Sequence, residues 1–337
     1  MKPEKLRAAV IGDGGWGTAL ALRLHRNGHD VRVWGPFPDY LDEIRRERAN
    51  RKFLPGVPLP EAIAWEAEPA AAAAGADLVV LAVPSAYFAG VATRFAPHLP
   101  ADATLVSVTK GLDAHTHRRM TVVAGEILGK GPVAALSGPS FAEEVAREMP
   151  TAVVVACADA GRARRLQRAF GAPAFRVYTS DDPAGVEFGG ALKNVIAIAA
   201  GISDGIGFGH NAKAALMTRG LAEIARLGVA LGARAATFSG LSGLGDLVLT
   251  CTGRLSRNRG FGERLGRGER AAQILAGTVQ VVEGAANCAS AVALAREAGV
   301  RCPITEEVDA VINQGKDPRE AVRDLLTREM RPERDAN

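Results

Sequence analysis

The chain has 337 residues, of which 47% are hydrophobic and 23% charged, so it can bury sizeable cores and is unlike a disordered protein. Its 41 basic and 37 acidic residues leave a formal net charge of only +4, without a dense basic stripe, which argues against nucleic-acid binding. No stretch approaches the roughly 20 uninterrupted apolar residues that cross a bilayer, so we expect no membrane span. A chain of this length predicts two domains.

The N-terminal segment and the cysteines indicate the compartment. The chain begins Met-Lys-Pro-Glu-Lys and lacks the long apolar region of a signal peptide, so we expect a cytoplasmic protein. Cys157, Cys251, Cys288 and Cys302 are scattered, and no pair has Cys-x-x-Cys spacing. We therefore expect free thiols and no metal site.

The first half of the chain alternates short apolar runs with segments of helical period. The predicted strands cover residues 7–11, 31–34, 77–83, 104–108, 133–136 and 151–156, and a helix follows the first strand to about residue 27. This alternation is typical of an α/β fold with a parallel, doubly wound sheet. The apolar run at residues 78–83 suits a strand that is buried on both faces. We predict a Rossmann-like N-terminal domain.

The pattern changes near Asp181, after which the chain is almost wholly helical in period. Gly-rich segments at residues 201–209 and 240–245 are predicted to break the helices. We therefore predict a Rossmann-like domain over residues 1–185 and an all-α domain over residues 186–337.

A Gly-x-Gly-x-x-Gly pattern follows the first predicted strand and opens the first predicted helix. Gly12 permits the tight turn, Gly14 lets the backbone approach a pyrophosphate, and Gly17 allows the helix to pack closely on the sheet. The helix N-terminus then offers N–H donors to an anion. Alone the pattern also fits a plain Gly-rich turn, but its position between strand and helix favours dinucleotide binding.

The end of the second predicted strand leaves the choice between NAD and NADP open. An Asp or Glu at this point would hold the ribose 2′-hydroxyl of NAD. The strand leads into Gly35, Pro36 and Phe37, and the next acid is Asp39. No Arg follows the strand directly to bind a 2′-phosphate.

Two lysines stand in contexts that favour a functional role. Only 8 of the 41 basic residues are Lys, so a Lys in an apolar or Gly-rich setting is informative, since Lys can lose its proton and Arg cannot. Lys110 follows a predicted strand, at the edge where doubly wound sheets bind ligands. Lys193 stands in a helix that is apolar all round, where a snorkelling surface Lys is less expected than a paired or functional one.

Polar groups in the second half complete a candidate active site. Asp246 lies in an apolar, Gly-rich turn and needs a cationic partner, while Ser256, Arg257 and Asn258 together suit a phosphate group. Hydride transfer to a ketone requires a group that polarises the oxygen and delivers a proton, and a partly desolvated Lys suits this task. These groups point to a small phosphorylated ketone as substrate.

Eight blocks occur in order along the chain, at residues 12–17, 109–112, 137–142, 193–195, 203–209, 243–247, 256–259 and 281–284. They closely resemble bacterial-type NAD(P)-dependent glycerol-3-phosphate dehydrogenase, from about residue 7 to residue 325. The resemblance implies an oxidoreductase that interconverts dihydroxyacetone phosphate and sn-glycerol 3-phosphate. It also implies NAD or NADP as cofactor and a role in supplying glycerophospholipid synthesis.

The resemblance further implies roles for single residues. Lys193 is implied as the general acid/base, with Lys110 and Asp246 in the proton network. Substrate contacts are implied for Lys110, Gly138, Ser140, Lys193, Asp246, Ser256, Arg257 and Asn258. Besides Gly12, Gly14 and Gly17, the implied cofactor neighbours are Gly15, Trp16, Lys110, Ala142, Arg257, Val281 and Glu283.

Alternatives stay open at this point. A related two-domain dehydrogenase of a β-hydroxyacid would share the Gly-rich turn and a catalytic Lys, and the Arg257–Asn258 pair would also bind its carboxylate. A non-catalytic dinucleotide sensor would be expected to lose Lys193 or Asp246, and both are present. Many relatives carry a basic or polar pair where this chain has Pro36 and Phe37, which leaves the cofactor preference open. The oligomeric state, a homodimer included, is not fixed by the sequence.

Overall fold

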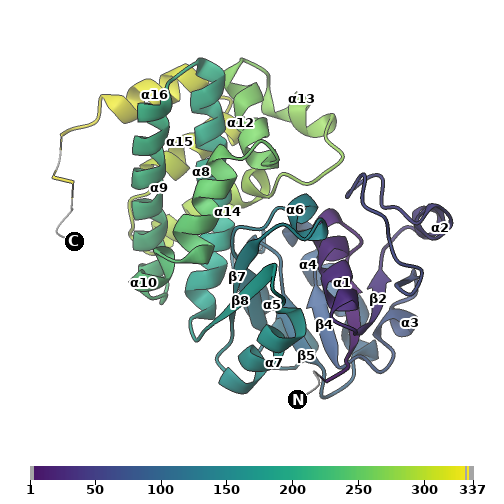
Figure 1. Ribbon diagram of the computed structural model, residues 1–337. Helices are drawn as coiled ribbons and strands as arrows, with labels where there is room; N and C mark the ends of the chain where they lie inside the picture. Colours follow the sequence, from purple (N-terminus) through teal and green to yellow (C-terminus); the bar gives the residue numbers. More distant parts are fainter. Residues whose placement is uncertain (1–3, 331, 334–337) are drawn as a thin grey trace.

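The computed structural model describes residues 4–330 and 332–333, and within them eight strands form one sheet in the order β3-β2-β1-β4-β5-β6-β7-β8 (Figure 1). The strands are β1 (Arg7–Ile11), β2 (Asp30–Trp34), β3 (Ala64–Glu66), β4 (Leu78–Leu81), β5 (Thr104–Ser107), β6 (Ala134–Ser137), β7 (Thr151–Ala156) and β8 (Phe175–Ser180). Strands β1 to β6 pair in parallel, and β7 joins β6 antiparallel. The predicted doubly wound N-terminal sheet is confirmed.

Helices cover both faces of this sheet. They are α1 (Gly15–Arg26), α2 (Pro38–Glu47), α3 (Pro69–Ala73), α4 (Ser85–Phe95), α5 (Met120–Leu128), α6 (Ala142–Ala146) and α7 (Ala160–Phe170). Successive residues of a strand point to opposite faces, so Ala8 and Val10 of β1 pack in the core beneath α1 and α7. Ala9 and Ile11 pack in the opposite core beneath α4 and α5. Burial on both faces explains the continuous apolar runs of the strands.

The six predicted strands are present, each within two residues of its expected ends, but the sheet differs from the prediction at its far edge. Strands β3 and β8 were not predicted, and the expectation of an all-parallel sheet is wrong at β7 and β8. Between β6 and β7 the only helix is the five-residue α6, which spans about 7.5 Å. It is too short to carry the chain back along a strand of about 20 Å, so the chain returns antiparallel.

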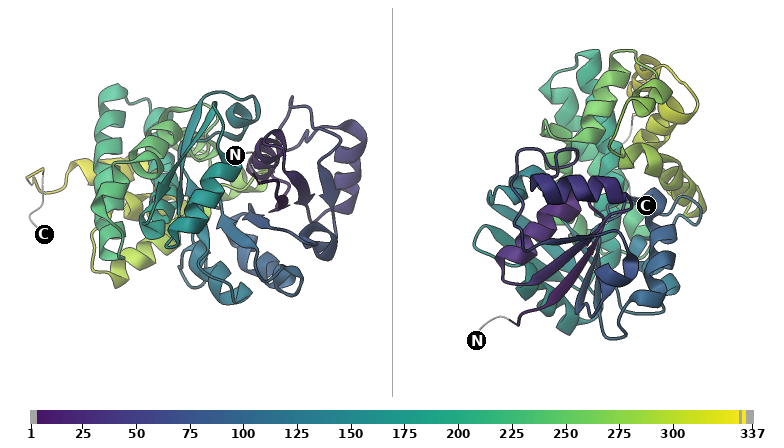
Figure 2. Two further views of the ribbon diagram at one scale, coloured as in Figure 1. Left: turned by 60° about the horizontal axis from the view of Figure 1, so that its bottom comes forward. Right: turned by 90° about the vertical axis from the view of Figure 1, so that its right-hand side faces the viewer.

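The second half is a helical unit built around α8 (Pro183–Ile206), as Figures 1 and 2 show. The helices that follow are α9 (His210–Ala230), α10 (Ala235–Phe238), α11 (Asp246–Thr252), α12 (Arg257–Gly266), α13 (Ala271–Ala276), α14 (Glu283–Glu297), α15 (Pro303–Asn313) and α16 (Pro318–Leu326). The predicted all-α second half is therefore confirmed. The division of the chain after residue 185 stays a prediction.

The predicted break at residues 201–209 is wrong at its start, because α8 continues through Gly201 to Ile206. A Cβ atom at Gly201 would lie 2.0 Å from the carbonyl oxygen of Arg259 in α12, and one at Gly205 would lie 2.2 Å from that of Glu263. These glycines therefore serve close contact between two helix backbones. They do not end the helix.

The antiparallel strands determine where α8 meets the sheet. Because β7 and β8 run against β1 to β6, β8 ends at the edge opposite the carboxyl ends of the parallel strands. Helix α8 then runs back toward those carboxyl ends, and Lys193 lies about 15 Å along it. A Cβ atom at Gly190 would lie 2.6 Å from Oγ of Ser137, the last residue of β6. The fold thus delivers Lys193 to the ligand-binding edge of the sheet.

Helix α8 is also the one described helix with the length and apolar composition of a membrane span. Its apolar window is wholly buried inside the protein. Residues 185–203 are enclosed by sheet and helices, which is the environment of a core helix in a large domain.

Candidate active site

A cleft of about 700 Å³ lies between the sheet and the helical half. Its walls are the β1–α1 turn, the residues that follow β2, β4 and β5, and parts of α8, α11 and α12. Ligands of doubly wound folds bind at this edge, outside the carboxyl ends of the strands. Segments from the N-terminal and the C-terminal halves of the chain therefore contribute to one candidate site.

At one end of the cleft a buried carboxylate lies between two lysines. Oδ2 of Asp246 accepts a hydrogen bond from Nζ of Lys110 at 2.7 Å, and Oδ1 lies 3.3 Å from Nζ of Lys193. Asp246 is 1% exposed and Lys193 is 4% exposed. Lys110 also donates to the carbonyl oxygen of Gly138 at 2.8 Å and to Oγ of Ser140 at 3.3 Å. The structure thus joins the three predicted catalytic residues in one network.

This environment changes the acidity of Lys193. Burial lowers the pKa of Lys193 from 10.5 to about 8, Asp246 opposes this shift, and the neighbouring charge of Lys110 adds to it. A Lys with a pKa near 8 can both donate and accept a proton close to neutral pH.

The Gly-rich segment before Asp246 brings the carboxylate to α8. Residues Leu241–Gly245 form one turn of π-helix, a form often found at functional sites, and α11 starts directly after it at Asp246. A Cβ atom at Gly189 would lie 2.7 Å from the carbonyl oxygen of Ser242, so only glycine fits there. Because the π-helical turn packs this closely against α8, the Asp246 carboxylate lies next to the Lys193 amine.

Two further residues contact Lys193 and were not predicted as functional: Asn194, which follows Lys193 directly, and Thr250, which lies one helical turn after Asp246. Nζ of Lys193 donates to Oγ1 of Thr250 at 2.8 Å and to Oδ1 of Asn194 at 3.0 Å. The Thr250 hydroxyl donates to the carbonyl oxygen of Asp246 at 2.6 Å, one turn earlier in α11. Asn194 also accepts from Nδ2 of Asn258, at 2.9 Å. Thr250 could have been found from the sequence, because it follows Asp246 by four residues and residues at this spacing lie on the same face of a helix.

At the other end of the cleft the β1–α1 turn fits a dinucleotide. Gly12 has φ 122°, a conformation open to glycine, and a Cβ atom at Gly17 would lie 2.1 Å from the carbonyl oxygen of Gly12. Gly14 has open space where a side chain would stand, and α1 begins at Gly15 with no acid in its first turn. The turn thus exposes backbone and a helix N-terminus to an anion, as a pyrophosphate requires.

Glu283 joins the helical half to the sheet half at the cleft. Its carboxylate accepts hydrogen bonds from the backbone N–H of Ser85 at 3.0 Å and from its hydroxyl at 2.5 Å. Ser85 is the first residue of α4, so the carboxylate lies at a helix N-terminus, where negative charge is favoured. Burial nevertheless raises the pKa of Glu283.

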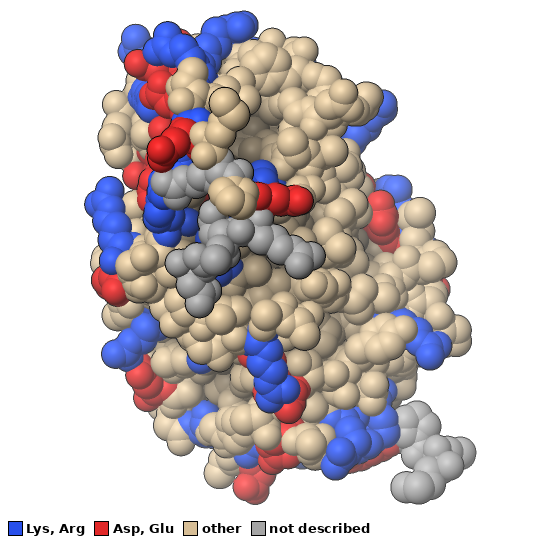
Figure 3. Space-filling model, turned by 90° about the vertical axis from the view of Figure 1, so that its left-hand side faces the viewer, with Lys and Arg blue, Asp and Glu red and all other residues tan. Residues whose placement is uncertain are grey.

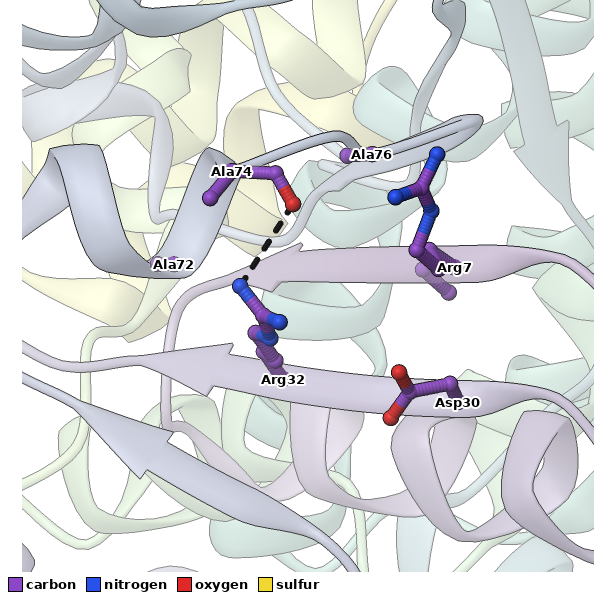
Figure 4. Close-up of a pocket in the computed structure, with 7 residues that line it drawn as sticks. Arg7, Asp30, Arg32, Ala72, Ala74 and Ala76 are labelled. Carbon is purple, nitrogen blue, oxygen red and sulfur yellow. Dashed lines mark hydrogen bonds between the residues drawn. The ribbon is translucent and has the colours of Figure 1, made fainter.

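A second depression lies at the amino ends of the strands and is too narrow to admit water. Figure 4 shows it between Arg7, Asp30 and Arg32, with Nη1 of Arg32 donating to the carbonyl oxygen of Ala74 at 3.4 Å. Among the described residues no group of three His, Cys, Asp or Glu side chains is arranged for a metal. All four cysteines are free and buried.

Comparison with known proteins identifies the family. A model of the NAD-dependent glycerol-3-phosphate dehydrogenase N-terminus matches residues 7–163, and a model of the C-terminus matches residues 182–323. The chain belongs to this family. The glycerol-3-phosphate dehydrogenase (NAD(P)+) of Geobacter metallireducens is 52% identical over 331 residues, covering 97% of this chain and 99% of the relative. That of Geobacillus kaustophilus is 50% identical over 330 residues, covering 97% and 96%.

Solved structures agree with this glycerol-3-phosphate dehydrogenase family. The crystal structure of glycerol-3-phosphate dehydrogenase from Coxiella burnetii superposes with a TM-score of 0.93 at 42% identity, covering 96% of this chain and 99% of the other. A ketopantoate reductase from Ralstonia eutropha superposes with a TM-score of 0.64 at 18% identity, covering 94% and 100%. The second likeness concerns the fold alone.

Most residues predicted for this dehydrogenase site line the one cleft. They are Gly12, Gly14, Gly15, Trp16, Lys110, Ser140, Ala142, Lys193, Asp246, Ser256, Arg257, Asn258, Val281 and Glu283. Gly17 and Gly138 do not line it: Gly17 packs α1 on the sheet, and the carbonyl oxygen of Gly138 holds Lys110. The role of each residue stays a prediction.

Proposed function

We propose that this chain catalyses the NAD(P)-dependent interconversion of dihydroxyacetone phosphate and sn-glycerol 3-phosphate. The observation that carries the proposal is the carboxylate of Asp246 between Lys110 and Lys193, at one end of a cleft whose other end is a dinucleotide-type turn. Membership of the family supports the same reaction.

Lys193 is the proton donor in this proposal. When bound along the β1–α1 turn, the nicotinamide cofactor supplies the hydride for reduction of the ketone carbon. Nζ of Lys193 then gives its proton to the developing alkoxide, and in the reverse direction the neutral amine accepts it. Nζ of Lys193 has three partners, which are Thr250, Asn194 and Asp246, and the Asp246 carboxylate is the most distant at 3.3 Å. In the proposed reaction the ketone oxygen takes the place of one of them.

Lys110 and Asp246 orient the proton donor and stabilise the charge that develops on the substrate. The charge of Lys110 stabilises negative charge on the substrate oxygen, and Asp246 keeps both lysines in place before the ketone arrives. Because these groups are already oriented, little reorganisation accompanies the reaction.

Arg257 and its neighbours are proposed to bind the phosphate of the substrate. The Arg257 side chain lines the cleft, and its Nη1 atom donates to the carbonyl oxygen of Val281 at 3.0 Å, which leaves further guanidinium donors for a ligand. Ser256, the N-cap of α12, and Asn258, in its first turn, flank Arg257, and Ser140 lies beside Lys110. A guanidinium with neutral donors suits a dianionic phosphate.

Kinetic assays with matched ketones test this function. We expect rapid oxidation of the reduced cofactor with dihydroxyacetone phosphate and far slower oxidation with dihydroxyacetone, which lacks the phosphate. In Lys193→Ala, kcat is expected to fall by roughly 10²–10⁴-fold or more, because proton transfer is lost. Turnover of a β-hydroxyacid without phosphate would overturn the assignment.

The same proposal includes the cellular setting. We propose an enzyme of the cytoplasm whose product supplies glycerophospholipid synthesis, with residues 1–185 binding cofactor and 186–337 binding substrate, acting alone or as a homodimer. We expect no nucleic-acid partner, and on the face that Figure 3 shows, basic side chains are interspersed with acidic ones. We also expect no membrane span, because α8, the one candidate among the described residues, is buried inside the protein.

A further inference from the structure

The β1–α1 turn contains a buried carboxylate, one oxygen of which has no hydrogen-bond partner among the described residues. Asp13, between Gly12 and Gly14, is 7% exposed, and its Oδ2 atom has no hydrogen-bond partner among the described residues. The backbone of Asp13 is held independently, because its carbonyl oxygen accepts from Nδ2 of Asn50 at 2.7 Å. A buried carboxylate oxygen without a hydrogen-bond partner is unfavourable for folding, so stability does not explain this side chain.

The Asp13 carboxylate occupies the place beyond the carboxyl end of β2. A Cβ atom at Gly35, the residue directly after β2, would lie 2.5 Å from Oδ2 of Asp13 and 2.7 Å from its Cγ. Gly35 is therefore required by the carboxylate, which fills the volume that a side chain at position 35 would take. Asp13 also lines the cleft.

This is where dinucleotide-binding folds carry the acid that binds the adenosine ribose. That acid is ordinarily the last residue of β2 or the one after it, and it accepts a hydrogen bond from the 2′-hydroxyl. Here the corresponding residues are Trp34 and Gly35, followed by Pro36 and Phe37. Asp39, the next acid in sequence, is exposed on α2 and does not line the cleft.

We propose that Asp13 is the specificity residue that binds the ribose 2′-hydroxyl of the cofactor, so that this chain selects NAD over NADP. The inference rests on the proposed function, since it concerns the cofactor of that reaction. The acid comes from the β1–α1 turn in place of β2. A 2′-phosphate would bring a second negative group against the carboxylate and lose the hydrogen bond.

Lys52 is a positively charged residue that lines the cleft near this turn. Its Nζ lies 5.0 Å from the ring centroid of Phe53, 5.7 Å from that of Tyr40 and 6.0 Å from that of Phe37. The charge of Lys52 favours the ionised form of Asp13, whose pKa burial raises to about 6. We therefore assign Lys52 as a countercharge that keeps Asp13 ionised at neutral pH. A site for 2′-phosphate is the competing assignment.

Calorimetric binding of two cofactor fragments tests the proposal without any reaction. ADP-ribose and 2′-phospho-ADP-ribose are titrated into the full chain and into Asp13→Asn at pH 8, where Asp13 is ionised. We expect the wild type to favour ADP-ribose by roughly tenfold to a hundredfold, as for a hydrogen bond to a charged group, and Asp13→Asn to remove most of this preference. Asp39→Asn is the matched control and should keep it.

The outcomes separate this proposal from the function on which it rests. If the wild type binds neither fragment, the dinucleotide site is wrong, and the proposed function fails together with the inference. Binding of both fragments with a preference for 2′-phospho-ADP-ribose, or a ratio that Asp13→Asn leaves unchanged, overturns the inference alone. A preference for the phosphorylated fragment that disappears in Lys52→Ala would assign Lys52 to a 2′-phosphate.

Discussion

Two buried carboxylates lie at opposite ends of the same cleft, and their surroundings differ. Asp246 is held between two lysines, and the network around it extends through Thr250 and Asn194. Asp13 has an oxygen without any hydrogen-bond partner among the described residues, and its negative charge is favoured by a backbone hydrogen bond and by the charge of Lys52. One end of the cleft is complete before a ligand binds, and the other is not.

The difference follows from what each end has to do. A group that moves a proton must be oriented in advance, because reorganisation during the reaction raises the barrier. A group that recognises a ligand can keep its hydrogen-bonding capacity unused until the ligand arrives, and the bound ligand then compensates its burial. We therefore expect changes at Asp246 to affect stability and turnover together, and changes at Asp13 to affect the choice of ligand.

The largest effect is expected from Asp246→Asn. The substitution leaves two lysines without their carboxylate, and breaking a buried ion pair in this way costs about 3–5 kcal/mol. It also disorders the proton donor, so kcat should fall by roughly 10²-fold or more. Urea unfolding and initial rates with dihydroxyacetone phosphate measure the two effects.

Asp204→Asn is the matched control for this change. Asp204 also lies between two cations, 2.6 Å from Nζ of Lys213 and 2.7 Å from Nη2 of Arg259, but it does not line the cleft. We expect it to lower the free energy of unfolding while kcat stays within about threefold, since it contacts no group at the proton site. Full activity in Asp246→Asn, or equal losses in both variants, would contradict the contrast between them.

The pH dependence of the reaction is the next largest expected effect. Because the pKa of Lys193 is lowered to about 8, its protonated form is lost as pH rises through 8 and not near 10.5. For reduction, kcat/KM should therefore fall about tenfold per pH unit above 8, and for oxidation it should rise up to 8 and then level off. Profiles in both directions measure this.

Lys110→Met sharpens the same test. Lys110 and Asp246 are the charged groups that face Lys193 most closely, and the charge of Lys110 contributes to lowering the pKa of Lys193. Removing that charge should move the midpoint of the reduction profile upward, whatever happens to its height. A midpoint that stays at the wild-type value would exclude Lys193 as the titrating group.

Sequence patterns predicted the central part of the fold because the strands there are buried on both faces. The apolar run at residues 78–83 and the Gly-rich turn after β1 are local signals that need no tertiary contact to be read. Strand β8 was missed although Phe175 and Val177 alternate with exposed Arg176 and Tyr178, which is the period of an edge strand. Strand β7 pairs antiparallel with β6 because α6 is too short to carry the chain back along the sheet. The residue pattern of β7 itself does not reveal this direction.

Part of the candidate site could likewise be predicted from the sequence, and part of it could not. Lys110, Lys193 and Asp246 were predicted to act together, and the structure places them within hydrogen-bonding or ion-pair distance. Asp13 was treated as a variable position of the Gly-rich turn, because spacing alone could not show that its side chain reaches the end of β2. Gly35 was a visible signal, since the acid expected beside the ribose was missing from β2. The contact between the Asp13 carboxylate and Gly35, which connects the two observations, could be seen only in the structure.

A smaller effect is expected from Thr250→Val, which keeps the shape and removes the hydroxyl. Oγ1 of Thr250 accepts from Lys193 and donates to the carbonyl oxygen of Asp246, so the variant leaves a buried charged donor with one partner fewer. We expect the free energy of unfolding to fall by about 1–3 kcal/mol and kcat to fall several-fold. Thr250→Ser retains the hydroxyl and should recover most of both, whereas equal losses in Ser and Val would assign Thr250 to packing alone.

The smallest effect is expected from Lys52→Gln, at the end of the cleft that is not preformed. Lys52 is exposed and lies over three aromatic rings, so its loss should lower the free energy of unfolding by only about 0.5–1 kcal/mol. It should leave kcat unchanged, because the proton site lies at the other end of the cleft. Without the countercharge, the pKa of Asp13 should rise above about 6, so the preference for ADP-ribose should decline at a higher pH than in the wild type. A fall in kcat would show instead that the two ends of the cleft are coupled, and that the separation between a preformed proton site and an open recognition site does not hold.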